Sequence, residues 1–339
     1  MTDMRRQTMK IYVYDMVDFE EEILGDIQKE SNDEIILSKN NLTEETLEGA
    51  KGCDGISVLG YSKVNEAILK KMKEYGILYL STRTIGYDHI DVKPAEKLGI
   101  HVFNAYYHPN NVADFTVMMM LIMLRKAKIS ICRALVNDFS LDGLQGREMR
   151  SLTVGVIGTG KIGATVIQNL SGFGCRILAC DKYHNPSIEN LASYVDLDTL
   201  YQESDIITLH VPLTDENYHM INYETIHKMK KGVILINTAR GHLIDTEGLI
   251  RALEEEYVGG AGIDTLEEEQ GIMHVHVGTK IVDKRSLLYL KQFPNVLYTQ
   301  HYAFYTKEAT ESMVRCGITS IQSAAKGEKS ICEVTKFPR

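Results

Sequence analysis

Short runs of β-branched and apolar residues alternate with amphipathic stretches in the first third of the chain. The apolar runs predict strands at residues 11–14, 56–59, 77–80 and 101–103. Helix formers with apolar residues three and four positions apart predict helices at 20–29, 44–50 and 65–74. This alternation indicates a parallel sheet that is covered by helices on both faces.

A second and stronger alternating series follows a long apolar helix predicted at 111–127 and a polar stretch at 138–150. It predicts strands at 154–157, 177–180, 206–210, 233–237 and 262–264, with helices at 162–170, 225–229 and 246–256. An amphipathic helix at 307–325 would complete the first series. We therefore expect two doubly wound parallel-sheet α/β domains, the first flavodoxin-like and built from residues 1–106 and 300–339, the second from 107–299.

Composition narrows the possible partners and the location. A net charge of −9 argues against a nucleic-acid partner, because phosphate binding requires a cationic surface. The densest apolar stretch, residues 117–124, is too short to span a membrane. No secretion signal is evident and the six cysteines lack CxxC spacing, so we expect a cytoplasmic protein with reduced thiols.

A glycine-rich turn opens the second domain. Residues 153–163 read TVGVIGTGKIG, so that an apolar strand runs through Gly158, Gly160 and Gly163 into a helix. Gly158 permits the tight turn, Gly160 lets the backbone approach a pyrophosphate, and Gly163 allows close packing of helix on strand. The helix N-terminus offers N–H groups to phosphates. This unit predicts a Rossmann NAD-binding domain, with Lys161 and Ile162 also at the cofactor.

Asp181 ends the next predicted strand, 18 residues after Gly163. A carboxylate there accepts hydrogen bonds from ribose hydroxyls and repels the 2′-phosphate of NADP, which favours NADH over NADPH. The structural alternative is a glycine-rich turn followed by an unrelated aspartate.

Three ionisable residues follow later strands, at the carboxyl ends where open α/β sheets present ligands. Arg240 follows the strand at 233–237, Glu269 lies five residues after Asp264, and His301 follows residues 296–300. Taken singly, each has a structural alternative: a surface ion pair, a solvated acidic turn within Glu267–Glu269, or a satisfied structural histidine.

Seven sequence stretches, in order along the chain, favour functional roles for these three residues over the structural alternatives. They are STRTIGYDHID (81–91), YYHPNNVADFT (106–116), TVGVIGTGKIG, LHVPLT (209–214), INTARG (236–241), GIDTLEEE (262–269) and QHYAFYT (300–306). Together they resemble the D-isomer-specific 2-hydroxyacid dehydrogenase family, and most of all its D-lactate dehydrogenase and vancomycin-resistance reductase branch. The resemblance implies an NAD-dependent enzyme that reduces a 2-keto acid to the D-2-hydroxy acid.

By position, the resemblance implies that His301 is the acid/base, Glu269 its partner and Arg240 the substrate anchor. An imidazolium suits proton donation near pH 7, and an adjacent carboxylate raises its pKa. Substrate contacts are implied at Ile85, Gly86, Tyr107, Tyr61 and Phe304, and further cofactor contacts at Val211, Pro212, Asn217, Thr238 and Asp264. Asp264 has a structural alternative, which is to order its own loop.

The identity of the substrate and the function class keep alternatives. Pyruvate, giving D-lactate, is the leading substrate, and phenylpyruvate or 2-ketoisocaproate is the alternative. A different class is an NAD-sensing corepressor-like protein, although the Arg–Glu–His set argues for an enzyme. No metal is expected, because His274 and His276 lack a third ligand at a useful spacing. A homodimer is expected, with residues 112–124 apolar enough to form its interface.

Overall fold

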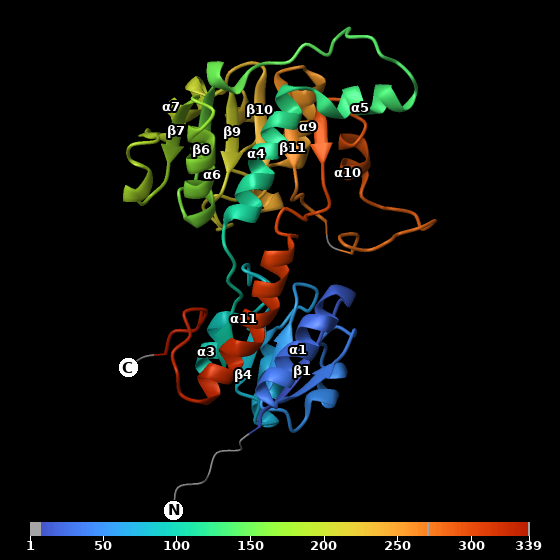
Figure 1. Ribbon diagram of the computed structural model, residues 1–339, viewed down its shortest axis with the longest axis vertical. Coiled ribbons are helices and arrows are strands. Elements are labelled where there is room, and N and C mark those ends of the chain that lie inside the picture. The colour runs from blue at the N-terminus through green and yellow to red at the C-terminus, as the bar shows by residue number, and fades with distance from the viewer. Residues whose placement is uncertain (1–7, 270, 338–339) are drawn as a thin grey trace, which may run out of the picture. The chain divides into compact units, whose positions relative to one another are not determined.

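The computed structural model describes residues 8–269 and 271–337, which divide into two compact units (Figure 1). The first unit combines the chain up to His108 with the chain from Tyr305 onward, and the second comprises Pro109–Phe304. The predicted boundaries were 106/107 and 299/300. Residues 300–304, including His301, therefore lie in the second unit and not in the first.

The first unit contains a five-stranded sheet in the order β2-β1-β3-β4-β5, with every neighbouring pair parallel. Its strands are β1 (Lys10–Val13), β2 (Glu34–Leu37), β3 (Gly55–Val58), β4 (Tyr79–Thr82) and β5 (His101–Phe103). This order is that of a flavodoxin-like sheet, as predicted. The edge strand β2 was missed, although three of its four residues, Ile35–Leu37, are apolar.

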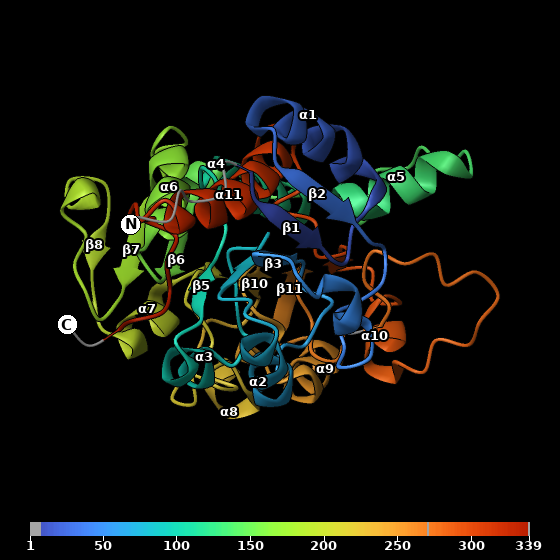
Figure 2. The ribbon, with the colours of Figure 1, turned by 90° about the horizontal axis from the view of Figure 1, so that it is seen from below.

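Helices cover both faces of this sheet. They are α1 (Glu21–Ser31), α2 (Glu66–Glu74), α3 (Val92–Leu98) and α11 (Lys307–Ala325), with 3₁₀ turns at Asp18–Glu20 and Thr46–Ala50. The last of these turns replaces the helix predicted at 44–50. α1 and α11 pack on one face, through Leu24, Val314 and Ile318, and α2 and α3 pack on the other (Figure 2). The C-terminal helix thus completes the first unit, as expected.

The second unit contains a seven-stranded parallel sheet in the order β12-β11-β10-β9-β6-β7-β8. Its strands are β6 (Thr153–Ile157), β7 (Arg176–Cys180), β8 (Ser193–Tyr194), β9 (Ile206–Leu209), β10 (Val233–Asn237), β11 (Val258–Ile263) and β12 (Val296–Tyr298). The strand order reverses between β6 and β9, and the crevice at the carboxyl ends of such a pair is where doubly wound sheets bind ligands.

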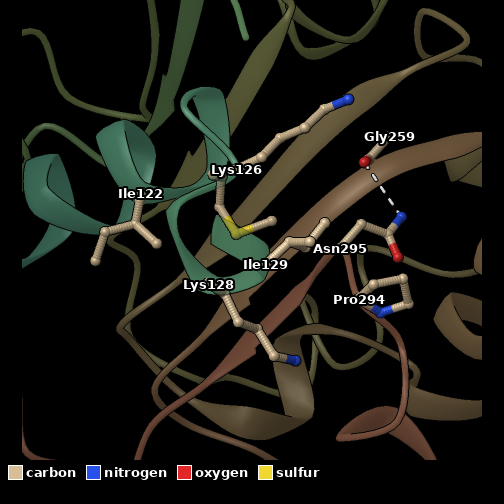
Figure 3. Close-up of a pocket in the computed structure, with 8 residues that line it drawn as sticks. Ile122, Lys126, Lys128, Ile129, Gly259, Pro294 and Asn295 are labelled. Carbon is tan, nitrogen blue, oxygen red and sulfur yellow. Dashed lines mark hydrogen bonds between the residues drawn. The ribbon is translucent and has the colours of Figure 1, made fainter. Parts of the chain in front are cut away.

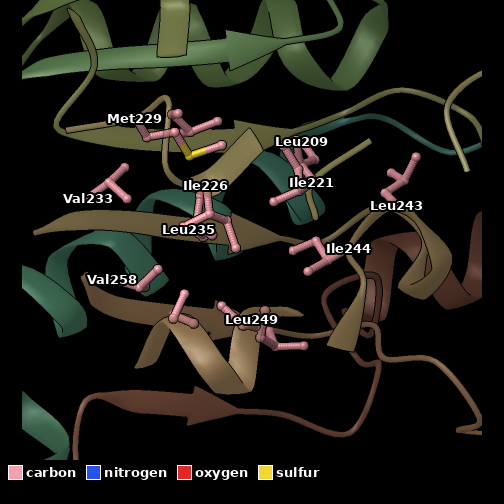
Figure 4. Packing of buried hydrophobic residues seen from close by; sticks show 14 of the residues in the cluster. Leu209, Ile221, Ile226, Met229, Val233, Leu235, Leu243, Ile244, Leu249 and Val258 are labelled. Carbon is pink, nitrogen blue, oxygen red and sulfur yellow. The ribbon is translucent and has the colours of Figure 1, made fainter. Parts of the chain in front are cut away.

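Helices α4 (Asn110–Leu124) and α6 (Lys161–Ser171) pack on one face of this sheet. The opposite face buries residues of α7 (Leu197–Glu203), α8 (Tyr223–Ile226), α9 (Thr246–Glu254) and α10 (Arg285–Leu290), part of which Figure 4 shows. Short 3₁₀ turns occur at Met149–Ser151, Pro186–Ile188 and Gly241–Leu243.

The helix predicted at 111–127 corresponds to α4 and ends three residues early, at Leu124, because a left-handed residue follows it. Lys126 has φ 49°, and a separate helix α5 (Ala127–Leu135) begins after it. Throughout the described part of the chain, none of the helices has the length and apolar character needed to cross a bilayer.

Candidate active site

The glycine turn between β6 and α6 has the geometry that phosphate approach requires. Gly158 has φ 97°, and a Cβ there would lie 2.6 Å from the backbone of His210. A Cβ at Gly163 would overlap the carbonyl oxygen of Gly158. A Cβ at Gly160, by contrast, meets no heavy atom within 4 Å, and no side chain caps the helix that Gly160 begins. The turn therefore fits a dinucleotide pyrophosphate at Gly160.

Two side chains from neighbouring strands border this turn. Asp181, directly after β7, accepts hydrogen bonds from the backbone N–H groups of Thr159, at 2.5 Å, and Tyr183, at 3.0 Å. His210 follows β9, and its Nε2 lies 3.0 Å from the hydroxyl of Thr208. Burial lowers the pKa of His210 to about 3, so this imidazole is neutral near pH 7.

His301 and Glu269 form a hydrogen-bonded pair at the carboxyl ends of β11 and β12. His301 Nδ1 lies 2.6 Å from Glu269 Oε1, and Glu269 Oε2 accepts the N–H of Leu266 at 3.1 Å. Burial alone would lower the pKa of His301, but the hydrogen bond and charge of Glu269 outweigh burial, and the net effect raises it. The arrangement favours an imidazolium held in one orientation.

Arg240 follows β10 and lies close enough for its positive charge to act on His301, where it opposes the rise in pKa. Its Nη1 donates to the carbonyl of Ala239 at 2.8 Å. The structure thus brings Arg240, Glu269 and His301 together at the carboxyl ends of the strands in the second unit. A guanidinium beside an imidazolium can bind an anionic substrate and donate a proton to it.

The backbone of His301 itself is held in an unfavourable conformation. His301 has φ 53°, in the left-handed region that non-glycine residues rarely adopt. The fully buried Asp264 carboxylate holds the loop there by accepting hydrogen bonds from the Thr299 hydroxyl at 2.6 Å and from the N–H groups of Tyr302 and Ala303. Backbone strain of this kind persists only where surrounding contacts enforce it. The contacts of Asp264 therefore show it ordering its own loop, which was the structural alternative. A contact between Asp264 and the cofactor stays a prediction.

The geometry also separates the three consecutive glutamates. Glu268 is exposed, and Glu267 pairs with His219 at 2.6 Å, whereas Glu269 alone reaches His301. Sequence analysis did not identify His219 or Glu267, because their contact joins positions 48 residues apart and no spacing signals it.

Two other predicted cofactor residues, Asn217 and Thr238, form side-chain hydrogen bonds within the protein. Asn217 donates to the carbonyl of Pro212 and accepts from the N–H of Thr214, both at 2.7 Å, which closes its loop. The hydroxyl of Thr238, after β10, lies 2.9 Å from that of Thr116. Val211 packs against the core, and Lys161 and Ile162 begin α6.

The predicted substrate residues divide between the two units. Ile85, Gly86, Tyr61 and Tyr107 belong to the first unit, where the carbonyl of Ile85 accepts from Asn104 and that of Gly86 from Thr84. Tyr107 is buried and Tyr61 is 40% exposed. Phe304 belongs to the second unit, and its ring lies edge-on to that of His274 at 6.0 Å. Their contacts with substrate stay predictions.

A separate hollow in the second unit lies at the amino ends of β11 and β12 (Figure 3). Its lining residues are Ile122, Met123, Lys126, Lys128, Ile129, Gly259, Pro294 and Asn295. Asn295 donates to the carbonyl of Gly259, and Lys128 donates to the carbonyls of Phe293 and Val296. Its polar groups thus serve the local backbone, and it lies at the strand ends opposite to those that bind ligands in open α/β sheets.

The chain is similar to several known reductases and dehydrogenases. At 47% identity over 275 residues, the chain is similar to an aromatic 2-oxoacid reductase of Clostridium sporogenes, covering 80% of this chain and 83% of that protein. It is 42% identical to a D-specific alpha-keto acid dehydrogenase of Enterococcus faecium, covering 81% and 84%. It is 35% identical to a D-lactate dehydrogenase of Escherichia coli, covering 94% and 98%.

Solved structures match nearly the whole chain, and a family model matches most of the second unit. The structure of a D-2-hydroxyisocaproate dehydrogenase matches with a TM-score of 0.88 at 32% identity, covering 97% of this chain and all of that one. The NAD-complexed form of a D-isomer-specific 2-hydroxyacid dehydrogenase from Lactobacillus delbrueckii ssp. bulgaricus matches with a TM-score of 0.84 at 33% identity, covering 96% and 100%. The family model for the NAD-binding domain of D-isomer-specific 2-hydroxyacid dehydrogenases matches residues 117–303. The chain therefore belongs to the D-isomer-specific 2-hydroxyacid dehydrogenases, as an NAD-binding oxidoreductase of that family.

Proposed function

We propose that this enzyme uses NADH to reduce a 2-keto acid to the D-2-hydroxy acid, with His301 as proton donor. The observation that carries the proposal is the 2.6 Å contact between His301 Nδ1 and Glu269, beside Arg240 and in the same unit as the glycine turn. NADH, when bound, supplies the hydride. The corepressor-like alternative would need none of these three side chains.

Each of the three residues has a different role in the reaction. The guanidinium of Arg240 offers paired donors to the adjacent carboxylate and carbonyl oxygens of a 2-keto acid. Because Glu269 engages Nδ1 of His301, Nε2 is the atom that donates the proton to the carbonyl oxygen as negative charge develops there. Glu269 stabilises the protonated ring before the transfer and holds its orientation afterwards.

Two candidate substrates differ in the size of the side chain on the 2-keto acid. Pyruvate is the sequence prediction, supported by the 35% identical D-lactate dehydrogenase. A bulkier 2-keto acid is favoured by the higher identity, 47%, to an aromatic 2-oxoacid reductase. We therefore expect kcat/KM with NADH to be higher for phenylpyruvate than for pyruvate, with 2-ketoisocaproate between them.

Initial rates with these three acids, and chiral analysis of the products, test both parts of the proposal. A D-hydroxy acid from any of the three supports the reaction. A preference for pyruvate would assign the smaller substrate, and an L product or no oxidation of NADH would contradict the proposed function.

Asp181 is expected to set the preference for NADH. Its carboxylate, fixed by Thr159 and Tyr183, would repel the 2′-phosphate of NADPH. Asp181→Ser should raise kcat/KM for NADPH and lower it for NADH, measured with one keto acid. Equal or better use of NADPH by the unsubstituted enzyme would show that Asp181 does not have this role.

The pH dependence of the reaction should follow the raised pKa of His301. Reduction needs the imidazolium, so activity is present at low pH and is lost as pH rises through that pKa. Glu269→Gln removes the hydrogen bond and charge that raise the pKa, while burial still lowers it. The loss should therefore occur at lower pH in the variant, whereas oxidation of the hydroxy acid, which needs the neutral ring, should persist to lower pH. Coincident profiles for both enzymes would argue against the pairing.

We propose a homodimer, with a surface different from the one predicted. In α4 the apolar residues are largely buried within the unit, including Val112, Val117 and Met120. The exposed apolar side chains lie just beyond, in and after α5, and are 62–83% exposed: Ile131, Leu135, Val136, Phe139 and Leu141. Such a patch is typical of a protein–protein contact.

Leu135→Glu combined with Phe139→Glu should give a monomer that still binds NADH, as measured by light scattering and NADH titration. An unchanged mass in light scattering would place the interface elsewhere. A cytoplasmic location stays a prediction.

A further inference from the structure

A second histidine–carboxylate pair lies on the same loop as Glu269. Glu267 Oε1 lies 2.6 Å from His219 Nε2, and Glu267 Oε2 accepts the N–H of Thr246, the first residue of α9, at 2.9 Å. Burial opposes ionisation of Glu267, but hydrogen bonds from Thr246 and His219 outweigh it and hold the pKa of this carboxyl below its ordinary value. An ionised carboxylate only accepts hydrogen bonds, so Nε2 of His219 carries the hydrogen.

These contacts join three separate segments at one point. His219 belongs to the loop after β9, Thr246 begins α9, and Glu267 belongs to the loop after β11. The backbone at the third segment also packs against Gly241, because a Cβ at Gly241 would overlap the backbone of Leu266 and Glu267. Gly241 directly follows Arg240. Arg240, the proposed substrate anchor, is therefore held directly beside the loop that carries Glu269.

The connection to His301 is short. Glu269 lies two residues after Glu267, and its Oε2 is bound to the N–H of Leu266, the residue before Glu267. Its Oε1 is the atom that meets His301. A displacement of Glu267 therefore moves the backbone donor that orients Glu269.

We propose that Glu267 and His219 form a positioning pair, which keeps Glu269 and Arg240 in register with His301. This inference rests on the proposed function, since it assigns the pair a role in that reaction. The pair acts through Glu269 and Arg240 and contacts neither substrate nor cofactor.

Glu267→Gln tests the pair with a minimal change in shape. The amide has one accepting oxygen, but Glu267 serves two donors, the ring N–H of His219 and the backbone N–H of Thr246. The amide oxygen can still serve Thr246, but its NH₂ group then faces Nε2 of His219, which must give up its hydrogen in order to accept, and the charge-assisted contact is lost. Glu268→Gln is the matched control, because it removes the same charge from the next residue, which is exposed.

The expected result is a kcat at least tenfold lower for Glu267→Gln, with the loss of reduction shifted to lower pH and NADH affinity retained. Glu268→Gln should match the unsubstituted enzyme in both kcat and pH profile. His219→Phe, which removes the ring donor, should reproduce the shifted profile and provides the test if Glu267→Gln fails to fold. NADH affinity measured by fluorescence distinguishes misfolding from misalignment.

The two proposals fail in different ways. If the unsubstituted enzyme reduces no 2-keto acid, the proposed function is wrong. If it is active, and Glu267→Gln and His219→Phe keep its kcat and pH profile, the positioning role alone is overturned.

Two thiols in the first unit carry a second, independent inference. Cys316 of α11 and Cys332, in the segment after that helix, have sulfur atoms 3.0 Å apart. A hydrogen bond from Cys332 lowers the pKa of Cys316 below that of an ordinary thiol, which favours the Cys316 thiolate. A disulfide needs a separation of about 2.05 Å, so a small movement would join them.

We infer that Cys316 and Cys332 form a disulfide on exposure to a peroxide. The Cys316 thiolate attacks one oxygen of hydrogen peroxide and the O–O bond breaks. The attacked oxygen stays on Cys316 as the sulfenic acid, and the other oxygen takes up a proton and leaves as water. The Cys332 sulfur then attacks the Cys316 sulfur, and the sulfenic oxygen leaves as a second water. The protein loses two hydrogens, and peroxide is the oxidant that is reduced.

Peptide mapping by mass spectrometry after mild peroxide treatment tests this inference. We expect one cross-linked species that joins the Cys316 and Cys332 peptides, is two hydrogens lighter than the two reduced peptides, and reverts with dithiothreitol. Cys332→Ser should leave Cys316 as a sulfenic acid that a dimedone probe traps, and Cys175→Ser should leave the cross-link intact. Oxidation of Cys316 beyond the sulfenic acid with no cross-link would overturn the inference.

Discussion

His301→Gln is expected to lower turnover of the 2-keto acid by a factor on the order of 10²–10⁴, the usual contribution of a positioned proton donor. Glutamine can still accept or donate a hydrogen bond, but it cannot release a proton at neutral pH. Because the glycine turn and Asp181 are unchanged, NADH should bind as tightly as before. Steady-state rates and NADH fluorescence titration measure the two effects separately.

His276→Gln is the matched control for this substitution. His276 lies on the exposed loop that precedes α10, and none of the roles proposed above involves it. It should leave kcat and KM unchanged. Equal losses in both variants, or none in His301→Gln, would remove His301 from the mechanism.

Arg83→Met is expected to cost about 3–5 kcal/mol of unfolding free energy, the typical loss when one partner of a buried ion pair is removed. Arg83 is fully buried, and its guanidinium binds both oxygens of Glu20 at 2.6 and 3.0 Å. It also donates to the hydroxyl of Ser57 and the carbonyl of Tyr14. Methionine fills part of the volume but leaves the buried Glu20 carboxylate without a counter-charge.

Urea unfolding followed by circular dichroism measures this loss. Arg315→Met provides the comparison, since Arg315 also binds both oxygens of one glutamate, Glu30, but at the surface. Exposed pairs contribute about 0–1 kcal/mol, so this variant should be nearly as stable as the parent. Similar small losses in both variants would mean that Glu20 takes up a proton or water when Arg83 is removed.

The sequence patterns predicted the two sheets because most strands are short, apolar and separated by helical stretches. They missed α3, where Pro94 suggests a break, although proline is tolerated in the first turn of a helix. The interruption at Lys126 was missed because arginine, lysine and alanine at 125–127 are all good helix formers, and only the backbone conformation of Lys126 breaks the helix.

At the site, motif order identified Glu269 and His301, and the structure then showed them in contact. Sequence could not decide between the two roles considered for Asp264, and it gave no role to Glu267. Their partners lie between 21 and 48 residues away, and no local spacing distinguishes a carboxylate that orders a loop from one that meets a ligand. The buried pair of Arg83 and Glu20, 63 residues apart, was missed for the same reason.

The division of the first unit between the two ends of the chain has a consequence for its synthesis. The apolar face around Ile11 and Val13 is covered in part by α11, which the ribosome makes only after the entire second unit. At about 5–20 residues per second, that interval is on the order of 10–40 s. During it the nascent sheet has an uncovered apolar face, whereas the cofactor-binding unit has all its elements available to fold as soon as the interval ends. We expect a holdase chaperone to associate with the nascent chain throughout this interval and to leave once residues 307–325 emerge.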